Sequence, residues 1–123
     1  MKKLLILLLL PLYAFAQDVD FDKINNKIQT LGNEAVTTYS NDNAMDVGDT
    51  FSDLYFDVFE GEGMEQEIAL SDPALKTKLE SQFNAVISHA MRSAPKVDVE
   101  KSWKVLSKSL QQTTDSHSPK DGS

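Results

Sequence analysis

Steps of three and four between apolar residues recur along four stretches of this 123-residue chain, and this spacing restricts the fold more than any other feature of the sequence. Such steps place the apolar side chains on one face of an α-helix. The four predicted helices cover residues 21–39, 43–59, 73–93 and 98–111. No stretch shows the alternation of apolar and polar residues that is typical of a half-buried β-strand. The sequence therefore predicts an all-α protein.

The residues between the predicted helices are typical of helix ends and turns. Ser40 to Asn43 is a run of capping residues, and Asp72 stands directly before a proline at the first position of the third helix. Glycines at positions 61 and 63 end the second helix, and a short helical piece is predicted from Met64 to Leu70. Because short links force neighbouring helices to run in opposite directions, we expect an antiparallel four-helix bundle.

The first sixteen residues have the composition of a signal peptide. Lys2 and Lys3 precede an unbroken apolar run from Leu4 to Leu10, and Ala14 and Ala16 have the spacing that signal peptidase requires. This run is shorter than the roughly 20 residues that span a bilayer, so we expect cleavage, a periplasmic protein and no membrane insertion of the mature chain. The predicted parts are a signal peptide at 1–16, a helical bundle at 17–111 and a disordered tail at 112–123.

Acidic residues dominate the expected mature chain, and cysteine is absent. The whole sequence has 12 basic and 19 acidic residues, and loss of Lys2 and Lys3 leaves 10 and 19, a formal net charge of −9. This balance disfavours nucleic acid and anionic membranes as partners and is compatible with metal cations or basic proteins. Without cysteine, thiolate metal sites and covalent haem attachment are excluded, and no haem is expected.

Five acidic residues form one continuous stripe along the second predicted helix, again at steps of three and four. Two interpretations are open. The stripe is either a solvated polar face, which is the commoner case, or a cation site in which bound charge offsets the repulsion between neighbouring carboxylates. The stripe consists of Asp46, Asp49, Asp53, Asp57 and Glu60.

The candidate metal ligands gather at the end of this helix and just beyond it. Three carboxylates have the spacing that lets them converge on one ion, and a fourth returns near them if the glycine link reverses the chain. A methionine and a histidine are further candidates, although such residues more often belong to the core and to the surface respectively. Iron or another divalent cation suits a site of this kind. The candidates are Asp53, Asp57, Glu60, Met64, Glu65 and His89.

The aromatic residues have simpler expected roles. Tyr55, Phe56 and Phe59 are predicted to belong to the core, and Trp103 is predicted to anchor the fourth helix. His117 falls in the predicted tail and is expected to have no role. With two histidines, no cysteine and no nucleophile motif, the chain lacks the residues of a hydrolytic triad, and we predict that it is not an enzyme.

The segment from Asp53 to Glu65 carries the pattern Asp-x-Tyr-Phe-x-x-Phe-Glu-x-x-Gly-Met-Glu, and Leu79-Glu80-x-x-Phe83 follows on the third predicted helix. Together these resemble the exported helical domain that precedes the membrane part of bacterial high-affinity iron permeases, the iron/lead transporter family. The matching residues are Asp53, Tyr55, Phe56, Phe59, Glu60, Gly63, Met64, Glu65, Glu80 and Phe83.

The resemblance implies a periplasmic accessory protein for iron uptake, which captures a metal cation or presents it to an inner-membrane iron permease. The Arg-Glu-x-x-Glu motif of the permease itself is absent, so this chain would act as a free-standing version of the exported domain. A second interpretation is a metal-free module whose acidic and aromatic segment docks on a membrane transporter or another exported partner.

Overall fold

The computed structural model describes residues 19–117, and in that part of the chain it contains five α-helices and no strand. The prediction of an all-α protein is confirmed. The predicted signal peptide, residues 1–16, lies outside the described residues. Within residues 19–117, none of the helices combines the length and apolar character needed to cross a bilayer. The helices are α2 (Phe21–Thr37), α3 (Ala44–Asp53), α4 (Met64–Ser71), α5 (Pro73–Met91) and α6 (Lys96–His117).

Two short elements complete this list. A 3-10 turn at Asn41–Asn43 leads into α3, and a π-helix at Leu54–Glu60 continues α3 without a break. The predicted second helix, 43–59, is therefore present as a continuous rod, but its second half is wound more widely than an α-helix. A π-helix closes hydrogen bonds between residues five apart, which turns its side chains to directions that an α-helical pattern does not predict.

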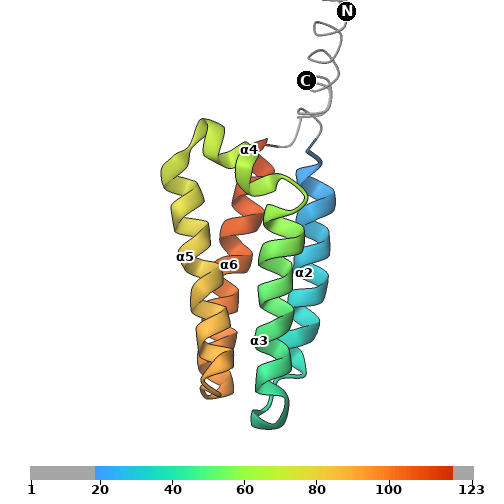
Figure 1. Cartoon of the computed structure of the whole chain (residues 1–123), viewed down its shortest axis with the longest axis vertical. Coiled ribbons are helices and arrows are strands. Elements are labelled where there is room, and N and C mark those ends of the chain that lie inside the picture. Colours follow the sequence, from blue (N-terminus) through green and yellow to red (C-terminus); the bar gives the residue numbers. More distant parts are fainter. Residues whose placement is uncertain (1–18, 118–123) are drawn as a thin grey trace, which may run out of the picture.

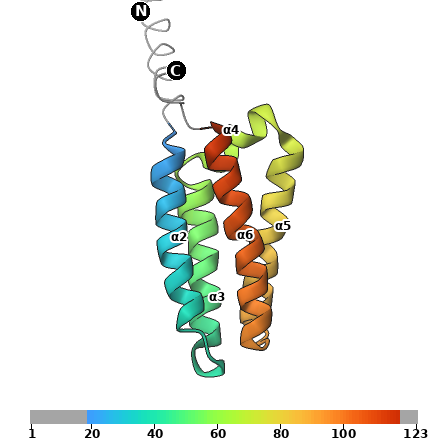
Figure 2. The same cartoon turned by 180° about the vertical axis from the view of Figure 1, so that it is seen from behind.

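Four long segments stand side by side, and consecutive ones run in opposite directions (Figure 1). Segment α3, with its π-helix, contacts α2 and α5, and α6 contacts the same two helices on the other side. Consequently α3 and α6 lie at opposite corners of the arrangement, which the front and rear views show (Figures 1 and 2). The short helix α4 packs against the π-helix and α5 at the end where the π-helix stops and α5 begins.

Side-chain caps fix where the helices begin. Asp20 accepts a hydrogen bond from the backbone N–H of Lys23 at 3.1 Å, and Asp72 accepts one from Leu75 at 3.1 Å, directly before the proline that opens α5. Ser40 and Asn43 form a reciprocal capping box before α3. These bonds satisfy backbone donors that the first turn of a helix leaves without partners. The predicted turn at 40–43 and the restart at Asp72 are confirmed.

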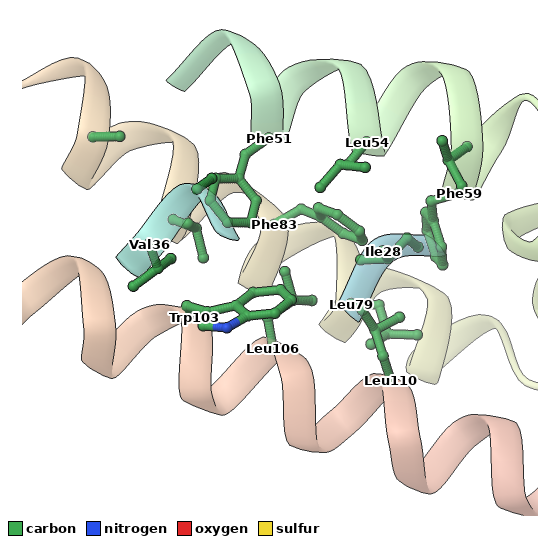
Figure 3. Close-up of a cluster of buried hydrophobic side chains, with 14 of the residues drawn as sticks. Ile28, Val36, Phe51, Leu54, Phe59, Leu79, Phe83, Trp103, Leu106 and Leu110 are labelled. Carbon is green, nitrogen blue, oxygen red and sulfur yellow. The ribbon is translucent and has the colours of Figure 1, made fainter. Parts of the chain in front are cut away.

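The core lies between the four long segments and contains side chains from all of them (Figure 3). Phe51, Phe59 and Phe83 are fully buried, and Trp103 from α6 packs against Phe51 with 5.4 Å between ring centroids. The indole N–H of Trp103 donates to Oδ1 of Asn33 at 2.8 Å, which ties α6 to α2. The prediction that Trp103 anchors the last helix is confirmed.

Two predictions about the ends of the pattern are wrong. Helix α6 continues to His117 instead of ending at Gln111, and Thr113 and Thr114 are buried. The last turns of α6 pack near the start of α2, where the His117 ring stacks on Phe21 with centroids 4.7 Å apart. The sequence did not predict this packing, because residues 112–117 are all polar. The disordered tail predicted from 112 is thus helical to 117, and residues 118–123 lie outside the described part.

Candidate carboxyl and tyrosine site

The π-helix, the glycine link and α4 together bring three polar side chains to one place. The backbone of Gly63 has a φ of 95°, a left-handed conformation that favours glycine, and α4 starts at the next residue. This turn directs the first residues of α4 back toward the π-helix and α5. Glu65 is consequently buried although it is charged in the unfolded chain, with only 8% of its surface exposed.

The hydroxyl of Tyr55 lies between two carboxyl groups. Its Oη atom is 2.9 Å from Oε2 of Glu65 and 3.3 Å from Oε2 of Glu80, so the π-helix, α4 and α5 each supply one member of the cluster. A phenol has a single proton to donate, and the two carboxyl groups therefore compete for it. Lys76, one turn before Glu80 on α5, forms an ion pair with the same Oε2 atom of Glu80 at 3.2 Å.

The environment divides the charge unequally between the two carboxyl groups. Burial, followed by the hydrogen bond to Glu80, raises the pKa of Glu65 to about 7. The hydrogen bond from Glu65 lowers the pKa of Glu80, and Lys76 lowers it further. Burial and the two carboxyl groups raise the pKa of Tyr55, which keeps the phenol protonated. Below pH 7, Glu80 is therefore ionised, and Glu65 holds a proton that it donates to Glu80.

Aromatic rings form the wall behind this cluster. The ring of Tyr55 packs against Phe83 at 5.2 Å and against Phe59 at 5.8 Å, and Phe59 and Phe83 lie 5.0 Å apart. Met64, immediately before Glu65, is completely buried. These contacts fix the orientation of the Tyr55 ring, whose hydroxyl reaches Glu65 and Glu80. The burial of Glu65 itself is the largest cause of its raised pKa.

The structure does not bring the six predicted metal ligands together. Asp53, Asp57 and Glu60 are solvent-exposed on the outer face of the α3 segment, as are the other two carboxylates of the acidic stripe. His89 lies about two and a half turns beyond Glu80 on α5, where its Nδ1 atom is 3.1 Å from Oγ of Ser102 on α6. Met64 is buried in the core. Of the six predicted ligands, only Glu65 belongs to the cluster described above, and the charge of Glu60 acts on it and contributes to raising its pKa.

No group of three or more histidine, aspartate or glutamate side chains in residues 19–117 has an arrangement that would hold a metal ion by itself. The exposed stripe agrees with the solvated interpretation of its charges. Phe56, which was predicted to belong to the core, is 57% exposed, so that prediction is wrong. Its neighbour Tyr55 turns inward toward α5, and the ring of Phe56 meets it edge-on with centroids 4.8 Å apart.

Sequence spacing missed Tyr55 and Glu80 as site residues. Tyr55 contacts Glu65, 10 positions further along the chain, and Glu80, 25 positions further along. The three residues lie on separate helical elements, so no repeat within one helix relates them. The signal that contained them was the family resemblance, because Tyr55, Glu65 and Glu80 all belong to the pattern that carries it. No family model, curated protein or solved structure matches this chain in comparisons with known proteins.

Proposed function

We propose that this protein is an exported accessory protein for iron uptake, an antiparallel four-helix bundle that captures a divalent cation and presents it to an inner-membrane permease. The observation that carries this proposal is the position of the Tyr55 hydroxyl, 2.9 Å from Glu65 and 3.3 Å from Glu80. Residues that resemble the exported domain of iron permeases, and that come from three separate elements, meet at this point.

The chemistry of the cluster suits a cation that binds and leaves again. Two carboxyl groups that share one proton offer a divalent cation two oxygen ligands once the proton is lost. Water would complete the coordination, since residues 19–117 supply too few ligands for a closed structural site. Glu80 keeps 28% of its side chain exposed, so one of the two carboxyl groups is reachable from solvent. A weak, open site is what delivery to a second protein requires.

The exposed stripe on the α3 segment has a supporting role in this proposal. Its carboxylates face solvent and end at Glu60, five positions before Glu65. A face of one sign of charge raises the local concentration of counter-ions around it. The stripe would therefore concentrate cations near the cluster without binding any of them tightly.

Calorimetric titration with iron(II) under anaerobic conditions, and with zinc as a redox-inert comparison, tests the proposal. We expect binding tighter than about 1 mM, which corresponds to roughly 4 kcal/mol, together with release of a proton at pH 6, measured in two buffers that differ in ionisation enthalpy. The E65Q/E80Q variant should lose at least about tenfold in affinity, or 1.4 kcal/mol. The E34Q/E100Q variant removes the same charge at two exposed positions and should bind as the original protein does.

Absence of binding in the millimolar range, or equal affinity in E65Q/E80Q and E34Q/E100Q, would contradict cation capture by this cluster.

A separate observation favours a second function, the docking of a protein partner without metal. Phe56 is 57% exposed and stands between the exposed carboxylates Asp53 and Asp57. An apolar ring surrounded by acidic groups fits a basic partner with an apolar patch, such as a membrane transporter, in a metal-free docking role.

Paired pull-down and calorimetric measurements on the D57N/E60Q variant separate the two functions. If the variant no longer pulls down the permease, and neither the variant nor the original protein binds metal, the result supports docking. Retained capture by the variant together with metal affinity that depends on Glu65 and Glu80 supports presentation of a cation.

A further inference from the structure

The outer face of α6 is basic, in contrast to the acidic character of the whole chain. Lys101, Lys104 and Lys108 follow one another at steps of three and four, so they lie along one side of the helix, and all three are exposed. We call these three residues the lysine face. The buried residues Trp103, Leu106 and Leu110 occupy the opposite side of α6.

The outer face of the α3 segment has the opposite charge and a similar repeat. Its five carboxylates are all exposed. The first three lie on α3 at helical steps of three and four, and the last two lie on the π-helix that continues it. We call all five the carboxylate face; its members are Asp46, Asp49, Asp53, Asp57 and Glu60. Helices α3 and α6 stand at opposite corners (Figures 1 and 2). Since the charged residues of both helices are exposed, one chain does not pair its own two faces.

Exposed apolar side chains accompany both faces. Met45 and Phe56 are 59% and 57% exposed beside the carboxylate face, and Val97 and Val105 are 64% and 48% exposed beside the lysine face. Leu31 and Leu70 are exposed elsewhere on the molecule, so single apolar side chains do not mark an interface by themselves. Here they add apolar contact area to two faces of opposite charge, and the opposite charges carry the argument for pairing.

We propose that the lysine face of α6 binds the carboxylate face of a second copy of this chain. The contact joins two different surfaces, so each added copy leaves one face of each sign free, and the chains form open rows. A second copy fits better than an anionic lipid surface, because the net charge of −7 repels such a surface as a whole. The same net charge opposes association between copies, and the rows are therefore weak and sensitive to salt.

This association is independent of the proposed cation site, since neither face includes Tyr55, Glu65 or Glu80. Sedimentation velocity on the protein as recovered from cells tests it, at about 20 mM and about 300 mM salt, which bracket strong and weak screening. We expect the weight-average mass to rise with protein concentration at low salt, and the apparent Kd to increase at least tenfold at high salt.

Two charge reversals and their mixture make the test specific. K101E/K104E/K108E and D49K/D53K/D57K should each sediment as a monomer at low salt. Mixed together, they should associate again, because the altered α6 of the first is then complementary to the altered α3 of the second. K23E/K78E/R92E reverses three exposed basic residues elsewhere and should still associate, although its net charge equals that of the first variant. Circular dichroism confirms that each variant is folded, and K104Q gives a milder version of the first.

Several results would overturn the proposal. They are a wild-type protein that stays monomeric at low salt up to millimolar concentration, a charge reversal that associates as the wild type does, or a mixture that stays monomeric. Binding of the wild type to phosphatidylglycerol vesicles that K101E/K104E/K108E loses, without self-association, would assign the lysine face to lipid instead.

Discussion

The indole ring of Trp103 occupies the space in which any residue other than glycine at position 32 would place its Cβ atom. A Cβ built on Gly32 would lie closest to Cη2 of Trp103, 2.7 Å from Cζ2 and 2.8 Å from Cζ3 of the same ring. Helix α2 has no side chain at Gly32, and the Trp103 ring of α6 fills the space that this leaves between the two helices. Asn33 then receives the indole N–H, so adjacent residues of α2 provide both the space and the hydrogen bond.

Replacing Gly32 by alanine should destabilise the protein, although alanine is the better helix former by about 1 kcal/mol. The added methyl group forces Trp103 and α6 to move, and overpacking of this kind costs about 1–3 kcal/mol. The comparison variant is G48A, where the added group would meet the flexible side chain of Met91, with Sδ at 2.7 Å. Urea denaturation should give a clearly larger loss for G32A than for G48A. Equal losses would show that the indole ring yields as easily as the methionine.

The stability of the protein should decrease as the pH rises from about 5 to about 8. The pKa of Glu65 is raised to about 7 in the folded protein, from 4.5. A raised pKa means that the folded state binds the proton more tightly, so this contribution is complete below the unfolded pKa and is lost as the pH rises through the folded one. The loss amounts to at most about 3 kcal/mol. The lowered pKa of Glu80 stabilises the folded state at every pH above its unfolded value of 4.5, so its contribution is constant over this range.

Urea denaturation at pH 5, 6.5 and 8 measures this dependence. The E65Q variant should lose the decrease, because its amide does not ionise, whereas E67Q removes a nearby carboxylate and should keep it. Taking the difference between each variant and the wild type removes the pH dependence that they share. A slope in E65Q equal to that of the wild type would contradict the assignment of the raised pKa to Glu65.

Replacing Tyr55 by phenylalanine should raise the pKa of Glu65 further. The hydrogen bond from Tyr55 favours the ionised carboxylate and lowers this pKa, while the aromatic packing of the ring is kept in the variant. Loss of a hydrogen bond to a charged group costs about 1.5–3 kcal/mol of stability. Carbon NMR of the side-chain carboxyl groups would follow the titration of Glu65 directly.

The matched control for this experiment is Y39F. Tyr39 donates its hydroxyl proton to the backbone oxygen of Ala94, so the variant also loses a buried phenol bond, but far from the cluster. It should lower the stability and leave the titration of Glu65 unchanged. A shift of that titration in Y39F equal to the shift in Y55F would indicate an effect of general loosening.

The last turns of α6 should contribute measurably to stability. Replacing His117 by alanine removes the stacking on Phe21 and should cost about 1 kcal/mol, the range for an aromatic pair. A chain that ends at Gln111 should lose more, because Thr113 and Thr114 are also buried. Q112A, at an exposed position of the same helix, is the control and should have almost no effect in thermal or urea denaturation. No loss on truncation would mean that these turns do not pack in solution.

The helical part of the fold could be predicted from the sequence because its signals are local. Apolar steps of three and four, the caps at Ser40 and Asp72, and the glycines that end the second helix act over a few neighbouring residues. They predicted the positions of all the long helices to within a few residues. They failed at the end of α6, where buried threonines have the composition of a tail, and at Phe56, which is exposed with the neighbouring carboxylates Asp53 and Asp57.

The candidate site was decided by the tertiary structure. Asp53, Asp57 and Glu60 had the spacing for a cation site, but their helix presents them to solvent. Glu65 and Glu80 lie on different helices, so helical spacing did not relate them. The left-handed turn at Gly63 and the packing of α4 on α5 bring both carboxyl groups to the Tyr55 hydroxyl. The sequence by itself determined the helices, because hydrogen bonds and caps along the backbone are local. Only the tertiary structure decided which carboxyl group is buried and holds a proton, because desolvation depends on every element packed around it.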